Sequence, residues 1–447
     1  MRKYIKNKIT EILSTIVEAN NILTDMIIND DTDNSNILLT DIQSTIIEIG
    51  NEIEKSEKDC QQLIGNMEEF CELLYKCSIA TMKKDRLHLC HAITENFNII
   101  REQIQALPVV YDLVFLPYKA SMWDSFESIW LAAKDNPNCN CHVMPIPYYD
   151  KKPDGSFGEI HYEGDLFPEY VPITDYRKYD LEQNHPDVIF IHNPYDQYNY
   201  ATSVHPDFYS RELKKHTDLL VYIPYFVCEE NTKEELLVNM GVLTADKVIV
   251  ESEKVKEQYI GAFINSILEN QKINVNNKIA SNSEYINNIR KMAESKFVAL
   301  GSPKYDKVIS SKKEDFTIPK EWADLIGSRK VVLYNTSISA FLNNKDRYLK
   351  KIRSVFEHFK NRKDVVLWWR PHPLMKATVD AMAPELSREY VSVVSEYRKE
   401  NFGIYDDTAD LHRAIAYSDA YYGDGGSLLA MYRVTGKPVM LQNINII

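Results

Sequence analysis

The sequence predicts an α/β protein with two parallel-sheet halves that follow a helical module. Heptad-spaced apolar residues occupy residues 1 to about 106, which is typical of helices packed as a coiled coil. After Pro108, short unalternating apolar runs alternate with helical stretches, as in buried parallel strands joined by helical crossovers. A second series of such runs begins at Val331. Two successive α/β halves should face each other across a cleft.

The helical module should form an antiparallel hairpin with a third helix. Residues 5–26 carry apolar side chains at alternating spacings of four and three, and residues 29–36 are a turn by composition. The same rhythm continues through 39–74, with Ser56 as its one polar interruption, and a third helix is expected over about 86–106. Two uses remain open: a packing or oligomerisation arm, through which homo-oligomers would form, or a peripheral membrane arm. The membrane arm would place four basic residues on anionic lipid: Arg2, Lys3, Lys6 and Lys8.

Segment boundaries follow from these patterns. The helical module is expected at 1–107, the first α/β half at 108–302, a polar connector at 303–330 and the second half at 331–447. The chain stops just beyond a strand, so a truncated second half is one expectation. First-half strands are expected at 113–116, 143–146, 188–192, 219–223, 248–251 and 297–300, and second-half strands at 331–335, 365–369, 420–422 and 438–441.

Composition narrows the class of protein. The net charge of −13 argues against a general nucleic-acid binder, whose affinity would rest on a basic surface. Seven cysteines without a pairing rhythm fit a reducing compartment. Glu11 and Glu18 interrupt what would be the apolar core of a signal peptide, and the run 219–228 is too short to span a bilayer. We therefore expect a cytoplasmic protein whose membrane contact, where there is any, is peripheral at the inner face.

Polar turns follow the strands of the second half, at the sheet edge where α/β proteins bind ligands. One turn delivers Arg370 and His372, which alternate with Pro371 and Pro373, and another, 423–427, leads into an apolar helical run. Glycines let main-chain N–H groups approach a ligand, and a helix start favours an anion. The sequence therefore predicts a diphosphate site at this rim. Its expected binding residues are Asn335, Ser337, Arg370, His372, Asp424, Gly425, Gly426 and Ser427.

Both turns also have a purely structural reading. The Arg-Pro-His-Pro sequence at 370–373 occurs in rigid surface turns, and short glycine motifs are weak signals alone. Three glycines within four residues are nevertheless unusual in a chain with only 14. Asp424 is poorly suited to contact phosphate, so we expect it to orient a neighbour or to bind a hydroxyl.

His192 ends a strand of the first half and is the candidate general base. With Asp196 nearby it could form a base and its orienting partner, or it could be hydrogen-bonded into the loop. Two Cys/His clusters, at 139–142 and 88–91, lack the spacing of zinc sites. The phosphate-binding motif of ATPases and the dinucleotide fingerprint are both missing. We expect no metal and no cofactor.

The motifs, taken in order, resemble those of the CDP-glycerol glycerophosphotransferases, the teichoic-acid polymerase-like family. They are LGSPKYD at 300–306, LYNTS at 333–337, RPHP at 370–373, the segment 417–427 and GKP at 436–438. The resemblance covers roughly residues 110 to 447 in architecture and is clear in its motifs from about 297 onward. It implies a GT-B fold with a Rossmann-like acceptor half and a Rossmann-like nucleotide-binding half. It also implies inverting transfer of glycerol phosphate without a metal, with the nucleotide diphosphate held by Arg370, His372, Asp424 and Ser427.

Two departures from the family pattern affect the expected mechanism. The family's D-Y/F-S-S turn is Asp424-Gly425-Gly426-Ser427 here, so one hydroxyl ligand is missing. The family's His-Gly acceptor motif has no match, and the residues at 222–226 stand in its place. His192 is the substitute base, while Arg370 and His372 would neutralise charge as CMP leaves.

The resulting function hypothesis is a transferase that moves glycerol phosphate from CDP-glycerol to a hydroxyl acceptor. The acceptor would be a cell-surface polymer precursor or a lipid-linked molecule in teichoic-acid or related cell-wall synthesis. Two alternatives remain open: a GT-B enzyme that uses another nucleotide-sugar donor, and a non-catalytic GT-B-like scaffold whose helical arm recruits partners.

Overall fold

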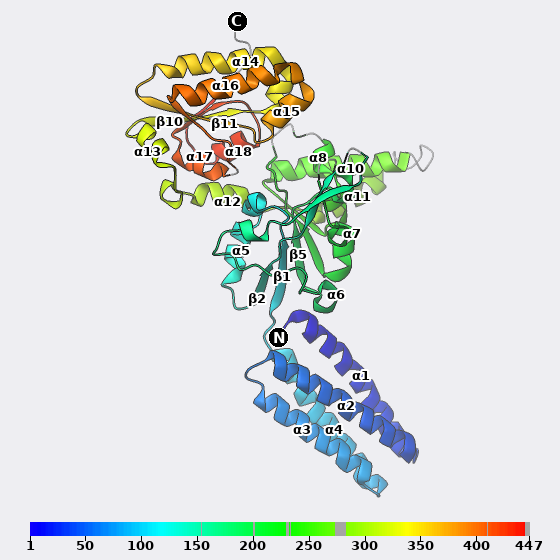
Figure 1. The fold of residues 1–447 in the computed structure, drawn as a ribbon. Helices are drawn as coiled ribbons and strands as arrows, with labels where there is room; N and C mark the ends of the chain where they lie inside the picture. The colour runs from blue at the N-terminus through cyan, green and yellow to red at the C-terminus, as the bar shows by residue number, and fades with distance from the viewer. Residues whose placement is uncertain are drawn as a thin grey trace.

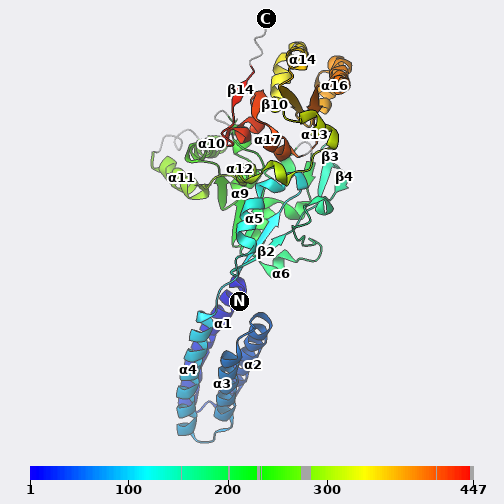
Figure 2. The same cartoon turned by 90° about the vertical axis from the view of Figure 1, so that its left-hand side faces the viewer.

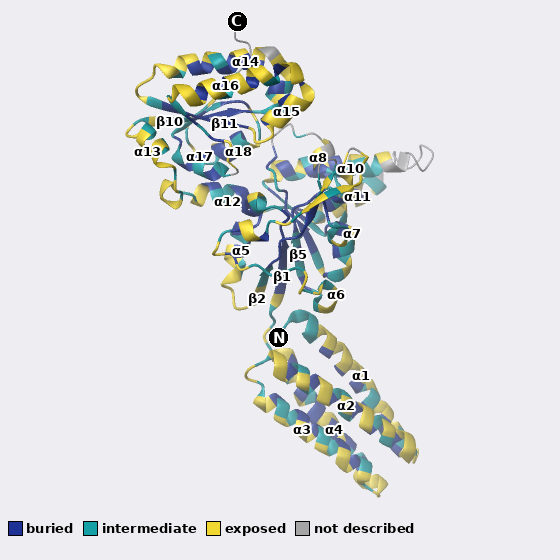
Figure 3. Cartoon of the chain, in the orientation of Figure 1, coloured by how far each residue is buried: buried dark blue, intermediate teal, exposed yellow. Residues whose placement is uncertain are grey.

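The structure is a computed structural model that describes residues 1–152, 154–199, 202–228, 232, 234–272, 283–408 and 410–442. A helical bundle, a six-stranded sheet and a five-stranded sheet follow one another along the chain and along the long axis of the molecule (Figures 1 and 2). The central strands of both sheets are largely buried, whereas the bundle helices each bury one stripe (Figure 3).

The module at the N-terminus is a bundle of four helices rather than the three expected. They are α1 (Lys3–Ile28), α2 (Thr32–Ser56), α3 (Gln61–Ile79) and α4 (Lys83–Ala106). The single helix expected over 39–74 is wrong, because the chain turns back at the four consecutive polar residues 56–59. Glu57 is extended there, and its carboxylate forms an ion pair with the amino group of Met1. The reversal lets both halves of the heptad pattern bury their apolar stripes in one core.

Basic residues at the start of α1 join the bundle to the six-stranded sheet. The Arg2 guanidinium lies 2.6 Å from the Asp112 carboxylate, and the Lys3 ammonium lies 3.0 Å from that of Asp218. Lys6 donates to the main-chain carbonyl groups at the end of α4. All three cations therefore pair with groups of the protein itself. Within the described residues, no helix is both long and apolar enough to cross a membrane.

The six-stranded sheet is parallel, in the order β2-β1-β5-β7-β8-β9. The strand expected at 143–146 lies earlier in the chain, because Pro145 and Pro147 lack the N–H groups that a strand donates. The strands are β1 (Tyr111–Leu116), β2 (Cys139–Val143), β5 (Val188–Ile191), β7 (Leu219–Tyr222), β8 (Lys247–Val250) and β9 (Phe297–Ala299). The longest helices that accompany them are α10 (Glu253–Lys272) and α11 (Ser283–Lys296).

A small antiparallel sheet, which was not expected, lies beside the six-stranded one. Its order is β4-β3-β6, built from β3 (Tyr148–Lys151), β4 (Phe157–His161) and β6 (Thr202–Val204). These strands are three to five residues long and mostly exposed or half-buried. Strands of this kind lack the apolar run by which buried strands are recognised.

The five-stranded sheet is also parallel, in the order β12-β11-β10-β13-β14. Helices α14 (Ile338–Lys360) and α16 (Ser387–Glu400) cover one face, and α17 (Leu411–Tyr417) and α18 (Ser427–Arg433) cover the other (Figure 1). Trp369 and Trp368, adjacent on one strand, enter separate apolar cores on the two faces. The strands are β10 (Lys330–Thr336), β11 (Val365–Pro371), β12 (Gly403–Tyr405), β13 (Ala420–Gly423) and β14 (Val439–Leu441).

Two parallel sheets with crossover helices, preceded by helical hairpins, are the predicted GT-B-like fold class. The polar stretch expected to be a plain connector contains two helices, α12 (Pro303–Ser310) and α13 (Lys320–Ile326). Helix α12 bridges the halves: Lys307 lies 2.9 Å from Glu127 of α5 (Glu127–Lys134), and Ser128 donates to Asp306 at 2.7 Å. On its other side Val308 packs in the core of the second half.

Candidate functional site

The carboxyl edge of the five-stranded sheet carries the predicted binding residues side by side. Strand register sets Asn335 next to Arg370 on one side and next to Gly423 on the other. Gly423 has a φ of +139°, and a Cβ there would overlap the main chain of Asn335. Only glycine therefore lets β13 turn at this point. The Asn335 side chain is buried and donates to the Tyr421 hydroxyl at 3.0 Å, so it supports the rim from inside.

Asp424 is buried and organises the glycine turn. Its carboxylate accepts the Ser337 main-chain N–H at 2.8 Å and the Tyr348 hydroxyl at 2.5 Å, and it forms an ion pair with Lys351. Burial, and then the Asp424 charge, raise the pKa of Tyr348 well above its usual value. Lys351 is itself 3% exposed, so both charges of the pair lie inside the protein. Asp424 thus ties the turn to the start of α14 and is occupied by these partners.

Arg370 is buried as well, and protein groups satisfy its charge. One guanidinium nitrogen lies 2.9 Å from Asp406, and the other donates to the Thr408 carbonyl oxygen at 2.6 Å. Asp406 is fully buried and also accepts from the Trp368 indole at 3.0 Å. Arg370 therefore fixes the loop after β12 and presents no free charge at the rim. Sequence reasoning missed Asp406, because the three-residue strand before it was not recognised.

The rim keeps an exposed surface at His372 and at part of the glycine turn. Gly425 and Ser427 are exposed, and a Cβ at Gly425 would meet no atom within 4 Å. The His372 ring accepts the Leu374 N–H on Nδ1 at 3.1 Å, so its neutral tautomer carries hydrogen on Nε2. Partial burial, and then the Arg370 charge, lower the pKa of His372. At neutral pH this ring offers a donor without a charge.

His192 cannot act as a general base, because both of its ring nitrogens are engaged in hydrogen bonds within the protein. Its side chain is fully buried, Nε2 accepts the Tyr118 N–H at 3.2 Å, and Nδ1 lies 2.9 Å from the Ser125 hydroxyl. That hydroxyl donates to the Met122 carbonyl oxygen, so it receives the Nδ1 hydrogen. Asp196, the expected partner, accepts from Ser210 instead. We therefore correct the assignment: His192 holds the loop after β1 in place.

Burial, and then the Lys304 charge, lower the pKa of His192 to about 3, which predicts a specific pH dependence of stability. An unfolded histidine has a pKa of about 6.5, so the unfolded chain binds more protons as the pH falls below that value. The stabilisation from neutral His192 is complete above about pH 6.5 and is lost at up to about 1.4 kcal/mol per pH unit below it. Urea unfolding from pH 7 to pH 5 should show a steeper loss for the wild type than for His192→Gln. Parallel slopes would contradict this role.

A cleft of about 690 Å³ lies between the two halves. Its lining residues come from the loop after β1, from residues 163–170, from α12 and from the start of α17. Lining residues include Ala120, Trp123, Asp124, Glu163, Lys307 and His412. Two parallel sheets meeting at a cleft of this size can enclose a small-molecule ligand.

A buried cluster of ionisable side chains joins the two halves at this cleft. The sequence analysis did not predict it. Asp124 accepts a hydrogen bond from the Lys304 ammonium at 2.5 Å, and its other carboxylate oxygen lies 2.9 Å from His412 Nε2. Burial opposes ionisation of Asp124, but Lys304 and then His412 hold the pKa of its carboxyl well below the usual range. His412 therefore donates from Nε2, which leaves Nδ1 unprotonated in the neutral ring. Among the described residues, that buried Nδ1 has no hydrogen-bond partner. No local signal predicted the pair, because its members lie 288 residues apart.

Comparison with known proteins gives neighbours in fold only. No protein-family model and no curated protein matches the chain. A UDP-N-acetylglucosamine 2-epimerase structure has a TM-score of 0.43 at 12% identity, covering 75% of this chain and 79% of that one. The UDP-GlcNAc 2-epimerase of Neisseria meningitidis, bound to UDP-GlcNAc, gives 0.40 at 10%, covering 74% and 82%. The wall teichoic acid polymerase TagF gives 0.38 at 10%, covering 85% and 78%. At these TM-scores the neighbours carry no argument about function.

Proposed function

We propose that the protein is a transferase that moves glycerol phosphate from CDP-glycerol to a hydroxyl group of a cell-surface polymer precursor or lipid-linked acceptor. One observation carries this proposal: the turn exposed at Gly425 and Ser427, held from inside by Asp424, at the carboxyl edge of a parallel sheet. The family resemblance of the motifs at 333–337, 370–373 and 417–427 supports CDP-glycerol as the donor.

On the donor side, the diphosphate is held by neutral donors rather than by free cations. The amide of Gly425 and the amide and hydroxyl of Ser427 bind phosphate oxygens, as such groups do in anion-binding turns. His372 Nε2–H donates to the departing CMP phosphate, where negative charge develops. Arg370 acts through Asp406 and the loop that this pair fixes, so it positions the site without contacting the ligand.

On the acceptor side, His412 replaces His192 as the general base. Its unpartnered Nδ1 accepts the proton of the acceptor hydroxyl, and Asp124 holds the ring through Nε2. The hydroxyl oxygen then forms a bond to the phosphorus that bears glycerol. The bond from that phosphorus to the bridging oxygen breaks, and CMP leaves with the electron pair. His412, Asp124 and Asp410 all line the cleft.

Thermal unfolding with nucleotides tests the donor site. A ligand at about 100 times its Kd stabilises the folded state by about 2.7 kcal/mol, which raises Tm by several degrees. We expect CDP and CDP-glycerol to give this increase, and UDP and GDP to give less. Gly425→Val should abolish the increase while leaving the ligand-free Tm unchanged, because the added side chain enters open space above the amides.

Gly261→Val is the matched control, since this glycine has equally open space but lies in α10 of the first half. It should retain the nucleotide response. A Tm that no nucleotide raises would overturn the proposed function, and a response confined to UDP compounds would overturn the CDP-glycerol assignment.

A further inference from the structure

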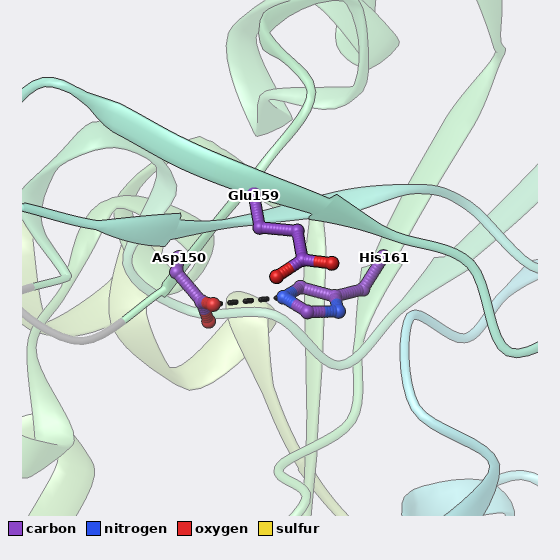
Figure 4. Close-up of side chains that lie close together, drawn as sticks. All are labelled: Asp150, Glu159 and His161. Atoms are coloured by element: carbon purple, nitrogen blue, oxygen red, sulfur yellow. Dashed lines mark hydrogen bonds and ion pairs between the residues drawn. The ribbon is translucent and has the colours of Figure 1, made fainter.

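The hairpin of β3 and β4 gathers three potential metal ligands outside the proposed active site. Asp150 comes from β3, and Glu159 and His161 come from β4. Figure 4 shows the three side chains pointing toward one another on one side of the hairpin. Their ligand atoms all lie within 4.8 Å of one another, and Asp150 Oδ2 is 2.8 Å from His161 Nε2.

Strand register explains why these side chains converge. Tyr148 pairs with His161 and Tyr149 with Ile160, and the register then shifts before Lys151 pairs with Phe157, so Asp150 and Glu159 lie at this irregularity, next to the pair that contains His161. The ligand oxygens of the two carboxylates lie within 4.8 Å of each other, and like charges at that distance repel. Among the described residues, no lysine or arginine forms an ion pair with either carboxylate. A bound cation would remove this repulsion.

We propose that Asp150, Glu159 and His161 bind a divalent transition-metal ion. Two carboxylate oxygens and one imidazole nitrogen suit ions such as Zn²⁺, Co²⁺ or Mn²⁺ better than Ca²⁺ or Mg²⁺, which prefer oxygen ligands alone. Ligands about 2.1 Å from a tetrahedral ion lie roughly 3.4 Å from each other. Small rotations of these exposed or half-buried side chains bring the three atoms to that spacing. Water completes the coordination.

The ion would act on the wall of the cleft through a short series of contacts. The His161 ring stacks on Tyr148, with centroids 5.1 Å apart. The Tyr148 hydroxyl donates to Glu163 at 2.7 Å, and the other oxygen of Glu163 accepts the Ala120 N–H at 2.8 Å. Ala120 begins the short helix η1 (Ala120–Ser125), which carries Asp124. Metal binding would therefore fix the hairpin against the element that holds the His412 partner, a structural role distinct from the transfer chemistry.

Titration of the chelator-treated full-length protein with Co²⁺ tests the site, because visible absorption reports bound Co²⁺ and near-ultraviolet charge-transfer bands report thiolate ligands. We expect saturable binding of one equivalent without a thiolate band. His161→Ala and Glu159→Gln should each weaken binding at least tenfold. His205→Ala is the control, because His205 faces Asp207 at 3.4 Å but belongs to no such three-residue group among the described residues. It should bind as the wild type does.

Glu159→Gln also keeps the test meaningful if His161→Ala misfolds. The glutamine has the same shape and removes a like-charge contact, so the metal-free variant should have a Tm equal to or above that of the wild type. Wild-type affinity in this variant would overturn the proposal. A spectrum dominated by thiolate bands, or the lack of saturable binding by the wild type, would overturn it as well.

Discussion

Replacement of His412 by alanine should lower kcat of the proposed transfer reaction by about 10²–10⁴-fold, the usual contribution of a general base. The fold should survive, because Asp124 keeps its 2.5 Å contact with Lys304 when the imidazole is removed. KM for the donor should change little, since the proposed diphosphate contacts lie on the glycine turn. Release of CMP from CDP-glycerol, measured with a hydroxyl acceptor present, gives both constants.

The matched control for that variant is His358→Ala, which removes an exposed imidazole from α14. Its kcat should equal that of the wild type. The nucleotide-induced increase in Tm should also be the same for His412→Ala and for the wild type. A loss of that increase would mean that His412 supports the donor site. An unchanged kcat would remove it from the mechanism.

The buried strands of both large sheets could be predicted from sequence, because their apolar runs are short, continuous and bounded by turns. Strand β12 could not be predicted, because its three residues, Gly403, Ile404 and Tyr405, form too short an apolar pattern. The position of Asp406, which follows this strand, was therefore missed as well. The four-helix arrangement was missed for a different reason. The heptad phase continues across 56–60, so periodicity alone cannot detect the chain reversal there.

The rule that ligands bind at the carboxyl ends of parallel strands led to residues that the structure brings together at one edge of the five-stranded sheet. It could not tell which rim residues face a ligand. Arg370 and Asp424 are occupied by Asp406 and Lys351, and both partners are distant in sequence. His192 illustrates the same limit: the neighbouring Asp196 suggested a catalytic pair, but a tertiary contact with Ser125 determines where the ring lies. Local sequence shows which residue types lie at the end of a strand. Contacts between residues that are distant in sequence decide which of those side chains can bind a ligand.

Lys351→Met tests whether such a buried pair shapes the donor site. The methionine fills the space but leaves the Asp424 carboxylate buried without its cation, which should lower the free energy of unfolding by about 3–5 kcal/mol. Asp424 is also the group that joins Ser337 and Tyr348 to the glycine turn. We therefore expect the nucleotide-induced Tm increase to fall together with stability, as measured by urea unfolding and thermal shift on the same samples.

Lys350→Met is a close control, because Lys350 is the preceding residue on α14 and is exposed. It should alter stability by less than about 0.5 kcal/mol, as surface substitutions do. Asp424→Asn in the Lys351→Met background should recover part of the loss, since it removes the unpaired charge and keeps an acceptor for the Ser337 N–H. Equal stability of Lys351→Met and Lys350→Met would show that the ion pair does not brace the turn. Reduced nucleotide binding by Lys351→Met at unchanged stability would instead indicate that Lys351 contacts the ligand. Loss of a stabilising ion pair would also lower the free energy of unfolding.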